Sequence, residues 1–139
     1  MTNNDNQLVI FWIAKQKYAV PVGCTNEIIR MVDITPLPQT NDYVLGIINL
    51  RGKVIPVINL HRKMGLPEQE KHKDNRIIVI ENEGKNMGMV VDRVDEVSKY
   101  NEEELGLLDV EFGDNPFVKN IVKRNQDIWL ILDLEVIVH

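Results

Sequence analysis

Hydrophobic residues in this chain gather in short runs that are separated by turn-forming residues. The most regular pair lies within Tyr43–Leu60, where two runs rich in Val, Ile and Leu flank Arg51-Gly52-Lys53. Glycine accepts the positive φ of a tight turn, so this stretch predicts a β-hairpin with Arg51 at its tip. Leu8–Ile13 is apolar without alternation, which predicts a central strand covered on both faces.

Three more hairpins follow from the same pattern. Their predicted strand pairs are Leu8–Ile13 with Tyr18–Val22 around Lys15-Gln16-Lys17, Arg76–Ile80 with Met87–Val91 around Glu83-Gly84-Lys85, and the two strands within Phe117–Leu134. Pro21 cannot donate a ladder hydrogen bond, so its strand is expected at a sheet edge or at a bulge.

The last hairpin repeats an earlier one. Phe117–Leu134 begins 74 residues after Tyr43 and matches it without a gap. When the two segments are aligned, the second is apolar at nine positions where the first is apolar: Tyr43, Val44, Ile47, Ile48, Val54, Ile55, Val57, Ile58 and Leu60. Asn125-Gln126 stands in place of Arg51-Gly52, so the arginine at the first tip is unmatched.

The segments between the hairpins are expected to be connectors. In Gly23–Asp42 we predict a short helical turn over residues 24–30, followed by a loop containing Pro36 and Pro38. His61–Asn75 is predicted to form a turn of helix and then an exposed linker. A second long connector is expected over Asp92–Pro116.

The predicted fold is therefore mainly β. Eight strands with short turns indicate two small five-stranded antiparallel β-barrel subdomains (SH3/OB-like), packed together with short helical turns. We expect one domain over residues 1–139, with subdomains at about 14–70 and 75–134 and with terminal segments exchanged between them. A groove between the subdomains is the expected site for a partner.

Composition narrows the class of protein. The chain has 139 residues, 44% hydrophobic and 27% charged, which is typical of one soluble globular domain. Its apolar runs fall short of the ~20 residues of a membrane helix, and its N-terminus lacks a secretory pattern, so we expect a cytoplasmic protein. Cys24 is the single cysteine, which excludes an internal disulfide. The net charge of −5 argues against nucleic acid or an anionic membrane as the main partner.

No catalytic constellation stands out, and we expect no enzyme activity, cofactor or metal. Gly84 and Gly88 lack the residues of a phosphate-binding loop. A catalytic thiol at Cys24, paired in space with His61 or His72, remains an alternative to a half-buried small residue, which is favoured. The histidines at 61, 72 and 139 lack metal-ligand spacing.

Two charged regions have competing interpretations. A cluster of acids is favoured as a solvated loop over a cation site: Glu102, Glu103, Glu104, Asp109, Glu111 and Asp114. An oligonucleotide-binding barrel is the alternative function, but aromatic residues make up only 6% of the chain. The basic residues Arg62, Lys63, Lys71, Lys73 and Arg76 lie among the acidic residues Glu68, Glu70 and Asp74. This segment therefore offers little net positive charge to a nucleic acid.

Arg51 has two interpretations of equal weight. A guanidinium on a stiff hairpin tip presents a planar fork of donors to a partner's carboxylate or carbonyl groups. The alternative is an exposed ion pair with Glu27, which contributes ~0.2–1 kcal/mol to stability.

The hairpin sequence resembles the CheW family of bacterial chemotaxis coupling proteins. The likeness rests on Asn49-Leu50-Arg51-Gly52, preceded by Tyr43-Val44-Leu45-Gly46 and followed by Val54-Ile55-Pro56-Val57, and it extends over residues 8–137. It also includes Asn26-Glu27-Ile28-Ile29-Arg30, Ile34-Thr35-Pro36-Leu37-Pro38, Gly88-Met89-Val90-Val91-Asp92 and Leu132-Asp133-Leu134-Glu135. Asn59-Leu60-His61 differs from the family's usual Asp-Leu-Arg, and Asn120 replaces a usual glycine.

The resemblance implies a free-standing, non-enzymatic cytoplasmic adaptor with two β-barrel subdomains. Such proteins link the cytoplasmic tip of methyl-accepting chemoreceptors to the regulatory domain of the histidine kinase CheA, within membrane-bound receptor arrays and without inserting into the membrane. The resemblance implies that Arg51 acts in receptor coupling. Asn49 and Gly52 belong to the same motif, and Glu27 is the implied ionic partner of Arg51. Receptor or kinase contacts are implied for Thr25, Ile77, Gly88, Val94 and Val97. From the residues alone, a core role is equally expected for Gly88, Val94 and Val97.

Overall fold

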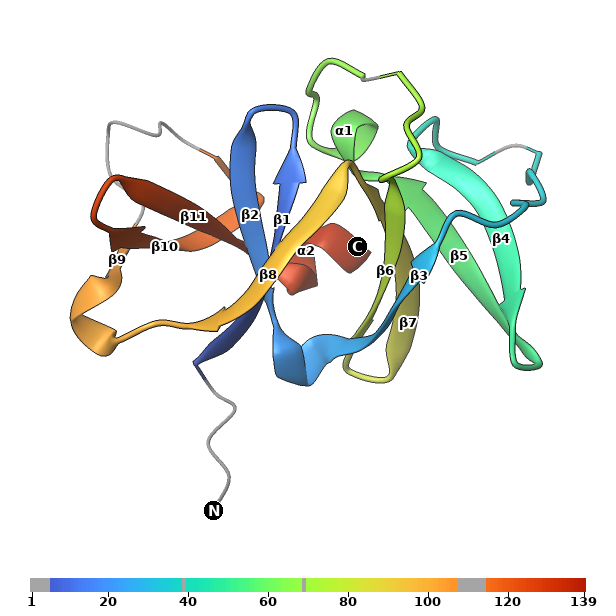
Figure 1. Ribbon diagram of the computed structural model, residues 1–139. Helices are drawn as coiled ribbons and strands as arrows, with labels where there is room; N and C mark the ends of the chain where they lie inside the picture. Colours follow the sequence, from blue (N-terminus) through green and yellow to red (C-terminus); the bar gives the residue numbers. More distant parts are fainter. Residues whose placement is uncertain (1–5, 39, 69, 108–114) are drawn as a thin grey trace.

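Two curved β-sheets stand side by side in the computed structural model (Figure 1). The structure describes the chain except for residues 1–5, 39, 69 and 108–114. The fold is mainly β, with two β subdomains and a few short helical segments, as the sequence predicted. No helix in the described part of the chain has the length and apolar character of a membrane span.

One subdomain is built on a six-stranded sheet with the order β8-β1-β2-β11-β10-β9. Its strands are β1 (Gln7–Ile13), β2 (Gln16–Pro21), β8 (Arg93–Lys99), β9 (Leu105–Leu107), β10 (Val118–Arg124) and β11 (Asp127–Leu132). The other is built on a five-stranded sheet with the order β3-β6-β7-β5-β4. Its strands are β3 (Thr25–Arg30), β4 (Val44–Leu50), β5 (Lys53–Asn59), β6 (Arg76–Asn82) and β7 (Lys85–Val91).

Each sheet combines strands from both halves of the repeat. The hairpin β1–β2 of the first half joins β8, β10 and β11 of the second, while β6–β7 of the second half joins β3, β4 and β5 of the first. The five-stranded sheet therefore uses residues 25–91, and the six-stranded sheet uses 7–21 and 93–132. The expected ranges of 14–70 and 75–134 do not describe the sheets, because hairpins far apart in sequence pair through their second strands.

Two details of the predicted sheets are wrong. The short strand β9 adds a sixth strand to one sheet. Neither sheet is wholly antiparallel, since β2 pairs with β11 and β5 pairs with β7 in parallel. The first difference is the pairing of a connector strand with β10, and the second is pairing between hairpins; the pattern within one hairpin encodes neither.

Both long connectors contain a strand that the sequence pattern did not predict. The helical turn expected over residues 24–30 is limited to η1 (Val22–Cys24), and β3 follows directly. Along β3 half-buried and exposed residues alternate, which is the period of a strand, and β3 pairs with β6 some fifty residues away. In the second connector β8 pairs in the same way with β1, followed by η2 (Glu102–Glu104) and β9.

The four predicted hairpins are all present, with small differences at their ends. The β1–β2 loop is Ala14-Lys15, and Pro21 ends β2, which lies inside its sheet and not at an edge. The proline is tolerated because it is the last residue of the strand. The helical turn after β5 is confirmed as α1 (Leu60–Lys63), and its counterpart after β11 is α2 (Leu134–Val138).

Among the described residues the hydrophobic core has three parts, and the largest lies between the sheets. Leu8–Ile13 is buried on both faces as predicted: Val9, Phe11 and Ile13 join the central cluster, whereas Leu8 and Ile10 face the inside of the six-stranded sheet. The equivalent strand β6 sends Ile78 and Ile80 to the central cluster and Ile77 and Val79 to its own sheet's core.

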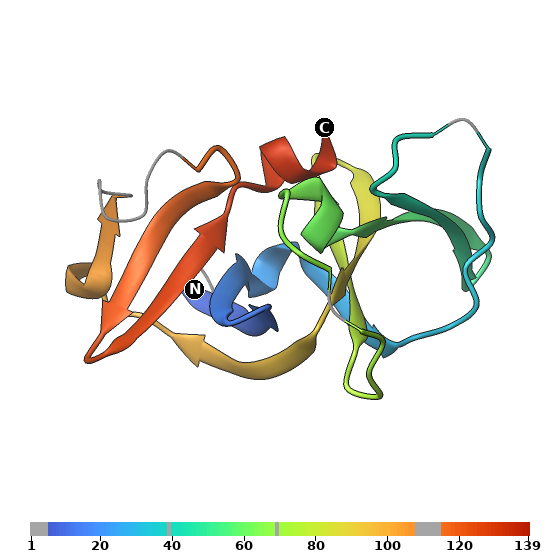
Figure 2. The same ribbon diagram turned by 90° about the horizontal axis from the view of Figure 1, so that it is seen from above.

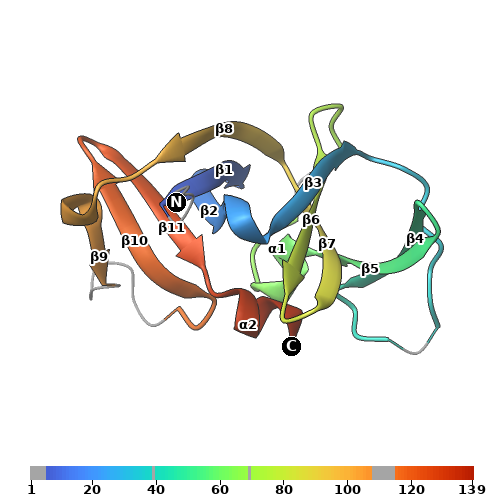
Figure 3. The same cartoon turned by 90° about the horizontal axis from the view of Figure 1, so that it is seen from below.

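Helices α1 and α2 lie at the junction of the two sheets (Figures 2 and 3). Leu60 from α1 and Leu134 and Ile137 from α2 belong to the central cluster. Side chains at native packing density transmit displacement with little compression. The shared core therefore joins the two subdomains into one stiff body.

Candidate protein-binding site

The Asn-Leu-Arg-Gly motif builds the tip of the β4–β5 hairpin. Leu50 pairs with Lys53, which leaves Arg51 and Gly52 as a two-residue loop with φ of 52° and 83°. Positive φ at both positions is the signature of a type I′ turn, which matches the twist of the flanking strands. The side-chain oxygen of Asn49 accepts the Gly52 N–H at 3.0 Å. Asn49 and Gly52 thus hold Arg51 in place on the turn.

Arg51 is paired with Glu27 on β3. Its two terminal nitrogens donate to the two carboxylate oxygens at 2.7 and 3.2 Å, in a bidentate geometry. The Arg51 side chain is nevertheless 78% exposed, while that of Glu27 is 21% exposed. Both interpretations of the sequence therefore fit the geometry, because the ion pair exists and the guanidinium is accessible to a partner.

The Arg51–Glu27 pair connects the two edges of the five-stranded sheet along the line where they face each other, called the seam here. β3 and β4 are the two ends of the five-stranded order, and the pair connects the tip beside β4 to β3. Further along β4, Thr35 and Ile47 form a backbone bridge. Beside the pair lies a depression of about 420 Å³. It is lined by Asn26, Glu27, Leu50, Arg51, Lys53, Ile55, Val79, Glu81 and Asn86.

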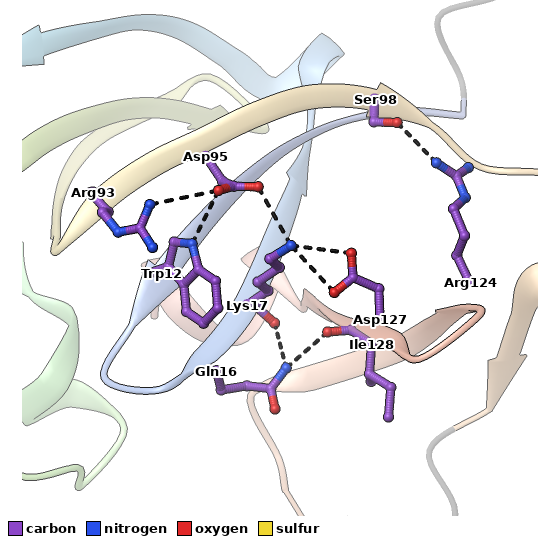
Figure 4. Close-up of polar contacts among 9 residues, drawn as sticks. All are labelled: Trp12, Gln16, Lys17, Arg93, Asp95, Ser98, Arg124, Asp127 and Ile128. Atoms are coloured by element: carbon purple, nitrogen blue, oxygen red, sulfur yellow. Dashed lines mark hydrogen bonds and ion pairs between the residues drawn. The ribbon is translucent and has the colours of Figure 1, made fainter.

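At the same end of the six-stranded sheet, Trp12, Lys17, Asp95 and Asp127 form a cluster of polar contacts (Figure 4). Equivalent strand registers place Lys17, Asp95 and Asp127 where the five-stranded sheet has Asn86, Asn26 and Lys53. The Lys17 ammonium lies 3.1 Å from Asp127 and 3.6 Å from Asp95, and 5.4 Å from the centre of the Trp12 ring. Burial lowers the pKa of Lys17, but Asp127 and Asp95 outweigh it and raise that pKa overall. The end that carries Arg51 instead has the solvent-accessible depression of about 420 Å³.

Edge strands β3 and β8 contribute a second feature, an apolar rim formed by Ile28 and Val97. Ile28 pairs with Ile78 and Val97 pairs with Val9, and both partners belong to the central cluster. Residues opposite each other on neighbouring strands share a face of the sheet. Ile28 and Val97 therefore border the junction of the subdomains, and they are 38% and 55% exposed.

Thr25 and Val94 lie at equivalent positions beside this rim. Each borders a register shift in its strand, β3 or β8. Val94 is half-buried against the central cluster, and the Thr25 hydroxyl donates to the Pro21 carbonyl at 3.0 Å. The structure thus brings Thr25, Val94 and Val97 to the junction, apart from the hairpin tip.

Ile77 and Gly88 lie inside the five-stranded subdomain. The Ile77 side chain has 0% exposure. A Cβ on Gly88 would lie 2.8 Å from the Ile77 Cγ2 atom and 3.3 Å from the Val57 Cγ2 atom. The close approach that Gly88 permits is therefore made by its own core, and not by an accessible surface.

The groove expected between the subdomains is mostly occupied. The central cluster fills the junction, and a depression of about 250 Å³ at its edge draws on both sheets, with Cys24, Asn82 and Asp133 among its lining. Ile28 was not predicted as a surface residue, because residues 24–30 were expected to be helical. The matching of Asn26-Glu27-Ile28 with Asp95-Glu96-Val97 between the halves was the signal that could have identified it.

The remaining candidates for chemistry have structural partners. His61 binds Asp92 and the Pro67 carbonyl, and Cys24 is half-buried. No group of three or more potential metal ligands occurs among the described residues. Glu104 pairs with Arg124. Of the acidic cluster, Asp109, Glu111 and Asp114 lie outside the described residues.

Comparisons with known proteins agree with the motif. The family model of the CheW-like domain matches residues 7–139. The chain is 34% identical to the chemotaxis protein CheW of Thermotoga maritima over 95% of this chain and 87% of that one. It is 32% identical to CheW of Helicobacter pylori over 93% and 79%.

A solved structure confirms the fold. The crystal structure of the scaffolding protein TtCheW from Thermoanaerobacter tengcongensis superposes with a TM-score of 0.86 at 35% identity, covering 92% of this chain and 88% of that one. The motif around Arg51, the duplicated β architecture and these similarities lead to one conclusion. This chain belongs to the CheW family of chemotaxis proteins.

Proposed function

We propose that this protein is a non-enzymatic cytoplasmic adaptor that couples methyl-accepting chemoreceptors to the histidine kinase CheA. The observation that supports this most is the presence of two distinct exposed features on one stiff body. The Arg51 tip lies at the open end of the five-stranded subdomain, and the apolar rim of Ile28 and Val97 borders the junction. A scaffold needs two such surfaces, and a catalytic centre is not required.

The apolar rim suits a helical partner. Ile28 and Val97 stand on different edge strands and on the same side of the central core. Two apolar anchors on a rigid surface match residues spaced along one face of an amphipathic helix. The helical tip of a chemoreceptor is a partner of this chemistry, and the rim is the surface that we assign to it.

Arg51 suits an acidic or carbonyl group of a partner at the tip. Its guanidinium is held by a rigid turn and by Glu27, so little side-chain entropy is lost when a partner binds. A fork that is oriented beforehand gives directional recognition that a mobile lysine lacks. Arg51 and the adjoining depression form the second surface, through which receptor and kinase are coupled.

Coupling follows from the stiffness of the body. A partner on one surface shifts the kinase equilibrium only if its contacts differ between the two kinase states. Each interface is expected to bury about 800 Å² or less per partner, because arrays assemble from repeated contacts of modest strength. Multivalency in the array then supplies the cooperative response.

A reconstitution tests the proposal. Membranes carrying chemoreceptors and purified CheA are combined with the wild-type chain, and kinase autophosphorylation is measured with and without receptor ligand. We expect receptor-dependent kinase activity only when the chain is present. Wild-type protein that binds neither partner, or nucleotide hydrolysis that persists through purification and changes with mutations in the chain, would exclude the adaptor function.

A further inference from the structure

His61 is buried in the second position of α1, between two hydrogen-bond acceptors. Its residue exposure is 5%. Nδ1 lies 2.8 Å from the carbonyl oxygen of Pro67, and Nε2 lies 2.8 Å from the Oδ1 atom of Asp92. A carbonyl oxygen and an ionised carboxylate accept hydrogen bonds and donate none.

Asp92 occupies the crossing point between the two sheets. It connects the end of β7 to the start of β8. Its Oδ2 atom accepts the N–H of Ala14 at 2.7 Å, and its own N–H donates to the Trp12 carbonyl at 3.1 Å. One carboxylate thus joins His61, beside the five-stranded sheet, to the β1–β2 loop of the six-stranded sheet.

The proton count at His61 follows from these contacts. A neutral imidazole carries one N–H and one lone pair, so it satisfies only one of two acceptors. The other ring nitrogen would then face an oxygen lone pair at 2.8 Å inside a buried site, and an unmatched buried polar contact costs about 1–3 kcal/mol. An imidazolium donates to both acceptors and neutralises Asp92.

The chain crosses between the two sheets after β2 and again after β7, and the His61–Asp92 contact occurs only at the second crossing. The duplicated strand order places Gly23 where the other crossing has Asp92, and Glu135 where it has His61. Gly23 has no side chain to form an ion pair. Ala14, which Asp92 holds, has a positive φ of 57° that a non-glycine residue rarely adopts. The carboxylate therefore also fixes the first residue of the β1–β2 loop.

We propose that His61 and Asp92 form a proton-dependent clamp between the subdomains, closed while His61 is an imidazolium and loosened when it loses its proton. This inference goes beyond the adaptor function and does not depend on it. The charged groups that line the depression beside His61 are Asp92 at the β7–β8 crossing, Arg62 on α1, and Glu68, Glu70 and Lys71 on the linker. Arg62 pairs with Glu68, and Glu70 and Lys71 carry opposite charges, so Asp92 is the decisive partner.

Nuclear magnetic resonance of the wild-type chain labelled with ¹⁵N-histidine tests the protonation state. His72 and His139, whose side chains are 59% and 50% exposed, serve as references in the same spectrum. We expect the paired nitrogen shifts of an imidazolium at His61 under the conditions in which the Ala14 amide is protected. The widely separated shifts of a neutral ring at His61 would overturn the proposal.

Hydrogen exchange of the Ala14 amide tests the clamp itself. In the wild-type chain we expect its protection factor to fall about fivefold or more as His61 loses its proton, because a charge-assisted network is replaced by a neutral one. Asp92→Asn should lower the protection at every pH and remove this step. Wild-type protection that stays constant through the His61 titration would contradict the clamp, and this result does not require a folded variant.

Discussion

Arg51 and Glu27 form a bidentate ion pair that fastens the tip of the β4–β5 hairpin to the edge strand β3. The two residues are 24 positions apart in sequence, and their strands lie at opposite ends of the sheet order. The pair therefore closes the five-stranded subdomain while the guanidinium stays exposed. A structural role and a recognition role fall on the same side chain, and mutations can separate them.

Arg51→Ala should remove partner coupling and leave the fold intact. The pair is exposed on the arginine side, so its loss is expected to cost about 0.2–1 kcal/mol of unfolding free energy. Thermal unfolding and co-precipitation of chemoreceptor and CheA measure the two effects on the same preparation. Arg30→Ala, which removes another exposed arginine from β3, is the matched control and should bind as the wild type does.

A charge swap sharpens this test. Glu27→Arg combined with Arg51→Glu keeps an ion pair across the seam but reverses the charge at the tip. We expect stability near the wild-type value and no recovery of partner binding. Recovery of binding by the swap would show that the pair acts only as a brace for the hairpin.

Ile28→Asp and Val97→Asp should each weaken chemoreceptor binding by about tenfold or more. Either carboxylate places a charge within an apolar contact, where truncation of an anchor typically costs above 1 kcal/mol. Binding of a receptor fragment can be followed by calorimetry. Leu37→Asp, at a comparably exposed apolar residue in the β3–β4 connector, is the control. Equal losses in all three variants would argue against a specific rim.

Gly88→Ala should destabilise the chain by about 1–3 kcal/mol, because the new methyl group overlaps the Ile77 side chain within a packed core. Denaturant unfolding measures the change. Gly23→Ala is the control, since no atom other than those of its chain neighbours lies within 4 Å of its Cβ position. Binding per folded molecule should be unchanged in Gly88→Ala; a binding loss without a stability loss would restore Gly88 as a surface contact.

Glu104 gives a pH dependence with a defined sign. The Arg124 side chain, assisted by the Asn101 N–H, lowers the pKa of Glu104 from 4.5 to about 2. A carboxyl whose pKa is depressed in the folded state stabilises the fold above its unfolded value, and this contribution is lost as the pH falls towards the folded value. The Tm difference between wild type and Glu104→Gln should therefore be full at pH 6 and shrink between pH 4.5 and 2.

The control for this pH effect is Glu103→Gln. Glu103 is exposed and neighbours Glu104 in η2. We expect its Tm difference from the wild type to stay small across the same range. A Glu104→Gln difference that does not vary with pH would show that the Arg124 contact contributes no charge-dependent stability.

The sequence by itself determined the local elements and the family. Alternating and continuous apolar runs specify hairpins because their contacts lie within a few residues, and glycine at position 52 specifies the tight turn beneath Arg51. The 74-residue repeat likewise predicted two similar subdomains. The Asn-Leu-Arg-Gly motif placed Arg51 at the hairpin tip and left an ion pair with Glu27 as one of two interpretations; the bidentate contact itself depends on the position of β3.

Tertiary structure alone decided which hairpins share a sheet and which candidates reach the surface. The parallel pairings of β2 with β11 and of β5 with β7 join segments far apart in sequence. Residues 25–30 form the strand β3 because their backbone pairs with β6. Burial of Ile77 beneath Gly88, and exposure of Ile28 and Val97 at one rim, depend on those pairings. Local propensity carries no information on contacts that are formed between distant segments, so the sequence pattern left them undetermined.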